Sequence, residues 1–133
     1  MYQEGSANRL QVRIVSGQYI ELSGSQVGNS NRIYSGTVTG QMAIEGLGHT
    51  IGFTQSGTGN AIFSDGSCCM DYGISGDNHL LDIQQLGNFN QALIDLSGTD
   101  NSLTILQGGN FNSVSGVMAG SGGVITILQG TSP

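Results

Sequence analysis

The chain has 133 residues, of which 9% are charged and 37% are hydrophobic, and its net charge is -6. This composition excludes a thick globular core but allows a thin, flat one. Its 23 glycines lack the Gly-x-y period of collagen, and the regular apolar spacing argues against disorder. The negative charge disfavours nucleic acid and anionic membranes as partners, and no apolar run is long enough for membrane insertion. No signal peptide is recognisable, so a secreted protein would be in a mature or trimmed form.

A short motif, Gln-x-Gly-x-x-Asn, recurs through the chain with both internal spacings intact. The copies are Gln3/Gly5/Asn8, Gln26/Gly28/Asn31, Gln55/Gly57/Asn60, Gln85/Gly87/Asn90 and Gln107/Gly109/Asn112, and a truncated sixth copy opens at Gln129. The motif glutamines are 22 to 30 residues apart, which is typical of repeat architectures. The sequence therefore predicts one repeat domain over residues 1–133, with copies starting near 3, 26, 55, 85, 107 and 129.

Strict apolar–polar alternation flanks each motif in chain order. The residues four before each glutamine are Leu22, Ile51, Leu81, Leu103 and Ile125, and those two before it are Gly24, Phe53, Ile83, Ile105 and Ile127. Two residues after each asparagine come Leu10, Ile33, Ile62, Ala92 and Val114. This period indicates half-buried strands, whereas a helix would space its apolar residues three and four apart. Each repeat is therefore expected to be a strand, a glycine corner and a second strand.

Two strands of five or six residues are not stable alone in water, so the repeats must stack. Stacked coils form two parallel sheets with strands about 4.7–4.9 Å apart. The predicted fold is an all-β solenoid of about five coils with cross-β geometry. Equivalent glutamines and asparagines then form inward ladders whose amides bond along the stack, and the motif glycine supplies a positive φ at the corner.

Two repeats are longer than the others. The excess is assigned to the returns 36–48 and 66–76, which are expected to project side by side as a lateral pad or as simple loop filling. The first contains Val38, Met42 and Ile44, and the second contains the adjacent pair Cys68 and Cys69. Free thiols, a strained bond between these neighbours and bonds to another chain all remain open for the two cysteines.

Candidate catalytic and metal-binding residues are few. His49 and His79 both lie six residues before a motif glutamine, so they are expected to stack as a surface turn ladder or, with Asp77, as a metal site. Asp82 and Asp95 are interpreted as charges that oppose sheet aggregation. No nucleophile, phosphate-loop or zinc-protease motif is present, so the sequence predicts neither an enzyme nor a cofactor.

The repeats resemble the curlin repeat of bacterial curli fibres, and the resemblance runs from Gln3 to Gln129. The family pattern is Ser-x5-Gln-x-Gly-x-x-Asn-x-Ala-x3-Gln. Here the leading serine is absent and only Ala92 keeps the alanine. The closing glutamine is replaced by Ile14, Thr37, Gly66, Leu96 and Met118.

The resemblance implies a secreted structural subunit of a functional amyloid. Such a subunit polymerises outside the bacterial cell and supports biofilm matrix and adhesion. The expected partners are further copies of the chain, a nucleator subunit and secretion machinery.

The two ends of the chain also suggest polymerisation. The chain opens with the second half of a coil and closes with the first half of one, without a polar capping unit. All three arginines lie near the N-terminus and seven of the nine acids lie from Glu45 onward, which favours head-to-tail contact. The expected junction residues are Leu10, Val12, Ile14, Ile125 and Ile127. Two alternatives remain. One is a fragment of a larger adhesin or passenger domain. The other is a monomeric solenoid that binds ice or carbohydrate, for which Thr37 and Thr39 form one Thr-x-Thr pair without repeats in register.

Overall fold

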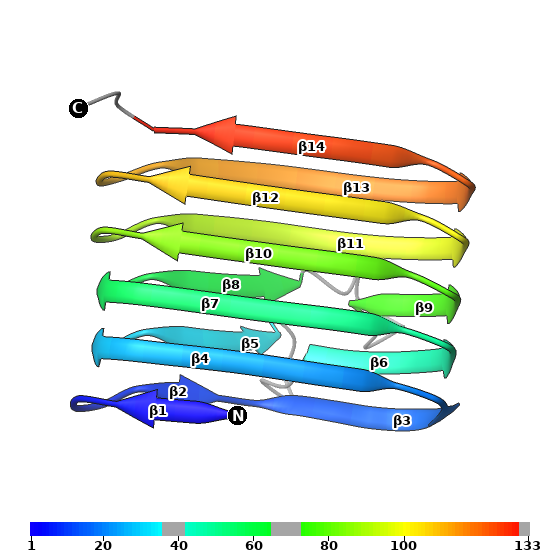
Figure 1. Cartoon of the computed structure of the whole chain (residues 1–133), viewed down its shortest axis with the longest axis horizontal. Coiled ribbons are helices and arrows are strands. Elements are labelled where there is room, and N and C mark those ends of the chain that lie inside the picture. The colour runs from blue at the N-terminus through cyan, green and yellow to red at the C-terminus, as the bar shows by residue number, and fades with distance from the viewer. Residues whose placement is uncertain (36–41, 65–72, 131–133) are drawn as a thin grey trace.

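The computed structural model describes residues 1–35, 42–64 and 73–130, which form two parallel β-sheets (Figure 1). Sheet A contains β1 (Tyr2–Glu4), β4 (Glu21–Asn29), β7 (Thr50–Thr58), β10 (Leu80–Leu86), β12 (Ser102–Gly108) and β14 (Val124–Gln129), in that order. Sheet B contains β2 (Arg9–Leu10), β3 (Val12–Gln18), β5 (Arg32–Ser35), β6 (Met42–Leu47), β8 (Ala61–Ser64), β9 (Ile74–Asp77), β11 (Gln91–Thr99) and β13 (Ser113–Ser121). No helix in the described ranges is long and apolar enough to cross a membrane.

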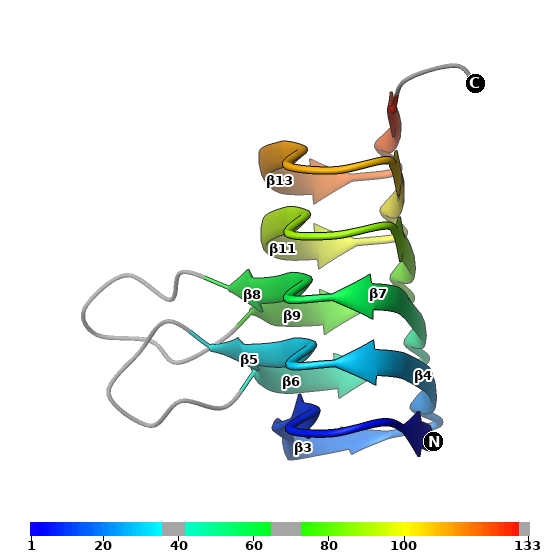
Figure 2. The ribbon, with the colours of Figure 1, turned by 90° about the vertical axis from the view of Figure 1, so that its left-hand side faces the viewer.

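The chain alternates between the two sheets, so each coil adds one tier to both layers (Figure 2). Every strand pairing is parallel, and the motif glutamines pair with one another along the whole of sheet A. This in-register stack confirms the predicted all-β solenoid of two parallel sheets. The alternation of apolar and polar residues fixes the register, since a slip by one residue would turn the apolar side chains outward.

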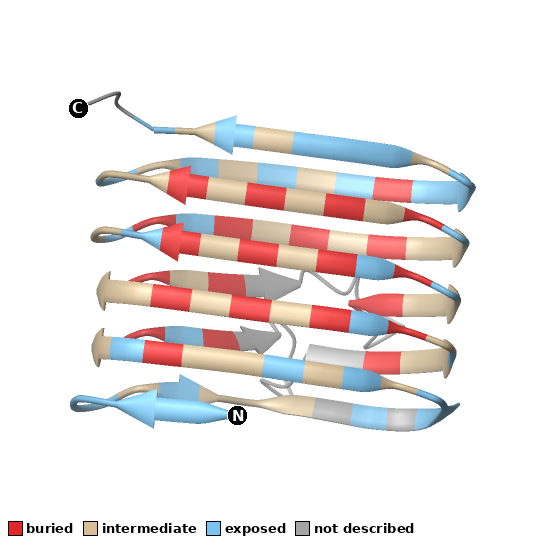
Figure 3. Cartoon of the chain, in the orientation of Figure 1, coloured by how far each residue is buried: buried red, intermediate tan, exposed pale blue. Residues whose placement is uncertain are grey.

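The core lies between the two sheets and is one side-chain layer thick on each face. Buried and partly exposed residues alternate along the central strands (Figure 3). The buried apolar residues are Ile33, Ile44, Ile51, Phe53, Ile62, Ile74, Leu81, Ile83, Ala92, Ile94, Leu96, Leu103, Ile105 and Met118. The strict alternation therefore identified the inward face correctly.

The assignment of the extra residues to the returns between coils was wrong. Both β6 and β9 belong to sheet B, where they continue the tiers that β5 and β8 begin. The extra chain thus interrupts the second strand of two coils and does not lengthen the return. Ile44 was expected in a lateral pad but is fully buried in the core. Val38, Cys68 and Cys69 lie outside the described residues.

The interruption also changes which residues are equivalent between coils. Ile14 pairs with Ile44, Ile44 with Ile74, Ile74 with Leu96, and Leu96 with Met118. Counting six residues forward from each motif asparagine would place Thr37 and Gly66 in this column. Both lie in the interrupting segments, outside the described residues. The column that holds the closing glutamine in the curlin pattern is therefore apolar in all five coils.

The first and last strands of the described chain both belong to sheet A. The short β1 pairs with β4 at one end, and β14 pairs with β12 at the other. The first and last described residues lie at opposite ends of the stack (Figure 1). The chain therefore contributes part of a sheet A strand before the half-coil from Asn8 to Ile14 that the sequence indicated.

Candidate functional site: the stacked corner ladders

The motif glutamines form one continuous hydrogen-bonded ladder inside the solenoid. Each side-chain amide donates to the side-chain oxygen of the next glutamine, at 2.7 Å from Gln26 to Gln55 and 2.8 Å from Gln55 to Gln85 and from Gln85 to Gln107. Gln3 begins the ladder below Gln26, and Gln129 ends it above Gln107. The same amides also donate to backbone carbonyls of sheet B, such as Ala61 O. The ladder therefore joins the coils to one another and the two sheets to each other.

The motif asparagines close the corner at which the chain passes from sheet A to sheet B, called here the first corner of each coil. The side-chain nitrogen of Asn60 donates to Ser56 O in its own coil and to Gly87 O in the next coil. Its side-chain oxygen accepts the backbone N–H of Asn90. Asn31 makes the equivalent contacts one coil below. Buried amides without partners are costly, so this full set of bonds explains why asparagine can be fully buried here.

The motif glycines allow neighbouring corners to approach closely. Gly28, Gly57 and Gly87 have φ between +109° and +118°, a region that side chains rarely adopt. A Cβ atom on Gly87 would overlap the carbonyl oxygen of Gly109. Glycine is therefore needed at this position for its conformation and for its lack of a side chain.

The first copy of the motif lies at one end of the stack, where it keeps the ladder bonds but is more exposed than the inner copies. Gln3 donates to Gln26 Oε1, and Asn8 donates to Gly28 O. Gln3 and Gly5 are exposed, and Asn8 is only half-buried. The cause is position, because these residues flank β1, the end strand of sheet A. Gly5 nevertheless keeps the corner geometry, with a φ of +101° and no room for a Cβ atom against Gly28 O. The first copy thus keeps the backbone geometry of the motif and its bonds along the stack, without the burial of the inner copies.

The last complete copy of the motif also departs from the inner ones. Asn112 is half-buried, whereas Asn60 and Asn90 are fully buried. Its side-chain nitrogen donates to Gly108 O at 2.6 Å and back to Asn90 Oδ1 at 3.0 Å, instead of forward along the stack. The carbonyl that it would reach by analogy with Asn60 belongs to residue 131, outside the described residues. The fully buried, forward-bonded asparagine is therefore a feature of the inner coils.

Three coils contain a related ladder at their second corner, where the chain returns to sheet A, and the sequence analysis had placed its two histidines at the surface. Asn101 donates to Ser97 O and to Gly120 O, as the inner motif asparagines do at the first corner. His79 and His49 occupy the equivalent position in the two preceding coils. Their Nε2 atoms contact Ser75 O at 3.0 Å and Glu45 O at 3.1 Å. A recurring Gly-x-x-Asn/His pattern, from Gly46 to Asn101, was the available sequence signal.

The two histidines act as the structural equivalent of asparagine at this corner. His49 Nδ1 accepts the backbone N–H of His79, and His79 Nδ1 accepts that of Asn101, both at 3.3 Å. The rings stack with centroids 5.1 Å apart, and both residues are at most 1% exposed. The expectation of stacking is confirmed, but the expectation of a surface ladder is wrong. Among the described residues, no group of three or more His, Cys, Asp or Glu side chains could hold a metal ion.

The arrangement requires a neutral imidazole on His79. Because Nδ1 accepts a backbone N–H, the ring proton must lie on Nε2, and a second proton would oppose the N–H of Asn101. Burial lowers the pKa of His79, and the charge of His49 acts in the same direction. The bond to Ser75 O and the carboxylates of Asp77 and Asp100 raise this pKa and oppose the shift.

The lowered pKa predicts a loss of stability in acid. Free imidazole titrates near pH 6.5, so below that pH the unfolded chain binds more protons than the folded chain. The free energy of unfolding should then decrease as pH falls, by at most about 1.4 kcal/mol per pH unit for this group. His79→Asn should remove this part of the pH dependence, because Asn101 fills the same position in the next coil. Denaturant unfolding between pH 5 and 7.5 measures the difference, and equal pH slopes for the two chains would contradict the prediction.

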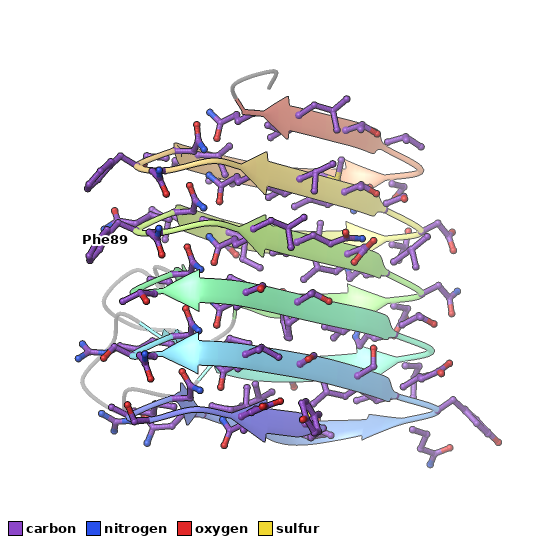
Figure 4. The ribbon with its side chains drawn as sticks, turned by 60° about the vertical axis from the view of Figure 1, so that its left-hand side comes forward. Phe89 is labelled. Atoms are coloured by element: carbon purple, nitrogen blue, oxygen red, sulfur yellow. The ribbon has the colours of Figure 1, made fainter. Side chains whose placement is uncertain are left out.

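Two aromatic side chains project from the first corner. Phe89, which is labelled in Figure 4, stacks on Phe111 with ring centroids 5.3 Å apart. The two side chains are 50% and 76% exposed. Both have positive φ, which is uncommon for a bulky residue. The ring of Phe89 also lies over Gly59 in the coil below. Both phenylalanines occupy variable positions of the Gln-x-Gly-x-x-Asn motif, and neither belongs to the apolar alternation that marks the core.

The remaining candidate residues are spread over the stack. Leu10, Val12 and Ile127 are partly buried against the core, whereas Ile14 and Ile125 are 49% and 38% exposed at opposite ends. Asp82 faces outward from β10 and accepts a bond from Gln84 at 3.0 Å. Asp95 lies between the buried Ile94 and Leu96 on β11. Cys68, Cys69, Thr37 and Thr39 lie outside the described residues.

A family pattern matches the amino-acid sequence, in the middle of the stack. Residues 76–105 carry a curlin associated repeat. No curated protein and no solved structure shows a significant match. The curlin repeat runs from Gly76 through β10 and β11 to Ile105 in β12, so it includes both kinds of corner. A curlin repeat in a parallel β-solenoid suggests a curli-like amyloid subunit, and the curlin family is structural.

Proposed function

We propose that the chain is the structural subunit of an extracellular curli-like fibre in which copies stack head to tail. The observation that carries this proposal is the polarity of the glutamine ladder. In every bond of the ladder, the lower-numbered glutamine donates its amide N–H to the side-chain oxygen of the higher-numbered one. Gln129 therefore presents an amide N–H at one end of the stack. Gln3 presents an acceptor oxygen at the other end.

This polarity favours one orientation of neighbouring copies. Contact between two like ends would oppose donor to donor or acceptor to acceptor, whereas contact between unlike ends would extend the ladder. The parallel strands have the same directionality. A heterologous contact that does not close produces a filament. The ladder and the sheets therefore both support a polar fibre.

The ends of the stack also present apolar surface. At the β14 end, Ile125 is 38% exposed although the equivalent Leu103 is 1% exposed. At the other end, Ile14 is 49% exposed although the equivalent Ile44 is fully buried. Covering such side chains with a second copy would stabilise the contact by about 25 cal/mol per Å² of apolar area.

Charge at the β14 end should prevent growth. Ile125→Lys with Ile127→Lys places two ammonium groups on the inward face of β14, where the next copy would pack, and should abolish filament growth while the inner coils remain folded. Val124→Lys with Thr126→Lys is the matched control, because these residues face outward from the same strand. Electron microscopy and circular dichroism measure the two effects. Normal filaments from the first variant would refute the proposed junction.

The curlin repeat at residues 76–105 supports a role for the fibre at the bacterial cell surface. The fibre would lie outside the bacterial cell, where it would support biofilm matrix and adhesion with a nucleator subunit and secretion machinery as partners. Removing the gene from its host should then eliminate both the surface filaments and the retained matrix. Filaments and matrix that persist in the deletion strain would contradict this role.

A further inference from the structure

The two end strands of sheet A occupy equivalent places in the repeat. β1 pairs with β4 so that Gln3 lies beside Gln26, and β14 pairs with β12 so that Gln129 lies beside Gln107. A β14 strand from a second copy, placed on β4 in the same register, would put its Gln129 beside Gln26. The two strands therefore compete for one position.

The number of tiers distinguishes the two ways in which copies could join. In the part of the chain that the structure describes, sheet A has six tiers. The eight strands of sheet B make five tiers, because three of these tiers consist of two strands each. Suppose that β1 of the next copy remained in place and stacked above β14. The β2 and β3 strands of that copy lie in the same tier as its β1, so the sheet B tier beside β14 would stay empty. If β14 replaced β1, each copy would contribute five tiers to both sheets. Only replacement keeps both sheets continuous.

The contacts that hold β1 are few. All three of its residues are exposed, it pairs with three residues of β4, and its Gln3 amide donates to Gln26 Oε1. Its outward side chains bond to each other, with Tyr2 donating to Glu4 at 2.6 Å. The Met1 side chain lies against Gly24, which lacks a side chain in the inward column that Phe53 continues. β1 and Met1 thus partly cover a surface that a longer strand could cover fully.

From these observations we propose that β1 is a displaceable strand that closes one end of sheet A until β14 of a second copy takes its place. This inference rests on the proposed function and specifies its junction. The six residues of β14 would pair with positions 21–26 of β4, which places Ile127 beside Gly24 and Ile125 beside Leu22. The coil at the junction would consist of β14 of one copy and β2 and β3 of the next. There, Leu10 and Ile14 of one copy would lie beside Val114 and Met118 of the other.

Disulfide trapping distinguishes replacement from simple addition. Replacement places Leu128 of one copy beside Ser25 of the next, whereas addition places it beside Tyr2. Adjacent parallel strands are close enough for a disulfide. We therefore compare Ser25→Cys/Leu128→Cys with Tyr2→Cys/Leu128→Cys, both with Cys68→Ser and Cys69→Ser, after oxidation of grown filaments. Covalent multimers are expected from the first pair and not from the second.

The axial rise per subunit gives an independent readout of the same junction. Replacement predicts five strand spacings, about 24 Å, whereas addition predicts six, about 29 Å. Gln3→Pro weakens β1 and should shorten the lag before growth several-fold under replacement. Three results would overturn replacement but not polymerisation. They are multimers from the Tyr2→Cys/Leu128→Cys pair alone, an axial rise near 29 Å, and slower filament growth of Gln3→Pro. A chain without any of these substitutions that forms no filaments would overturn the proposed function and this inference with it.

Discussion

Replacing Gln85 by alanine should lower the free energy of unfolding by about 3–5 kcal/mol. The substitution removes the bond accepted from Gln55 and the two bonds donated to Gln107 and Ala61 O. It also leaves a cavity, because Gln85 is fully buried. Each buried polar group that loses its partner costs about 1–3 kcal/mol.

Gln84→Ala is the matched control for this experiment. Gln84 is adjacent on the same strand but faces outward, where its amide donates to Asp82. Its removal should change stability by less than about 0.5 kcal/mol. Denaturant unfolding below the concentration at which filaments grow measures both values. Similar losses from the two variants would show that the ladder contributes no more than an ordinary surface glutamine.

Replacing Gly87 by alanine should destabilise the chain by more than about 4 kcal/mol. The residue has φ of +118°, and a new Cβ would overlap the Gly109 carbonyl oxygen, which is backbone and cannot rotate away. Relief would require neighbouring coils to separate at the corner, which would also weaken the bond from Asn60 to Gly87 O. Thermal unfolding should show a large decrease in Tm.

Gly52→Ala tests whether the effect belongs to the corner. Gly52 lies within β7, and a Cβ there would have its nearest neighbour, a carboxylate oxygen of Asp82, at 3.4 Å. Alanine in a strand costs less conformational entropy than glycine, so this variant should be neutral or more stable by about 0.5–1 kcal/mol. Equal destabilisation by the two substitutions would contradict the role given to the corner glycines.

The sequence predicted the main features of sheet A because its pattern is unbroken there. Inward residues alternate with outward ones up to each motif glutamine, and Gln55, Gln85 and Gln107 fix the register independently of the apolar pattern. The asparagines were identified by the same fixed spacing. The spacing could not show that Gly5 is exposed and Asn112 only half-buried, because identical motifs differ in burial once one of them lies at an end of the stack.

Sheet B was harder to predict because two of its strands are interrupted. Counting residues forward from Gln26 and Gln55 passes through the interrupting segments, so it reaches Thr37 and Gly66 where the stack has Ile44 and Ile74. The burial of His49 and His79 was missed for a different reason. Histidine in a glycine-rich corner resembles a surface residue until its two ring nitrogens are seen to replace the amide of Asn101.

The most direct test of the account is fibre diffraction from oriented filaments of the 133-residue chain, grown at neutral pH. We expect filaments with a meridional reflection at about 4.7–4.8 Å, from strands stacked along the fibre axis within and between copies. A protein that remains monomeric with β-rich circular dichroism, or filaments without this reflection, would contradict a stack that continues from one copy to the next.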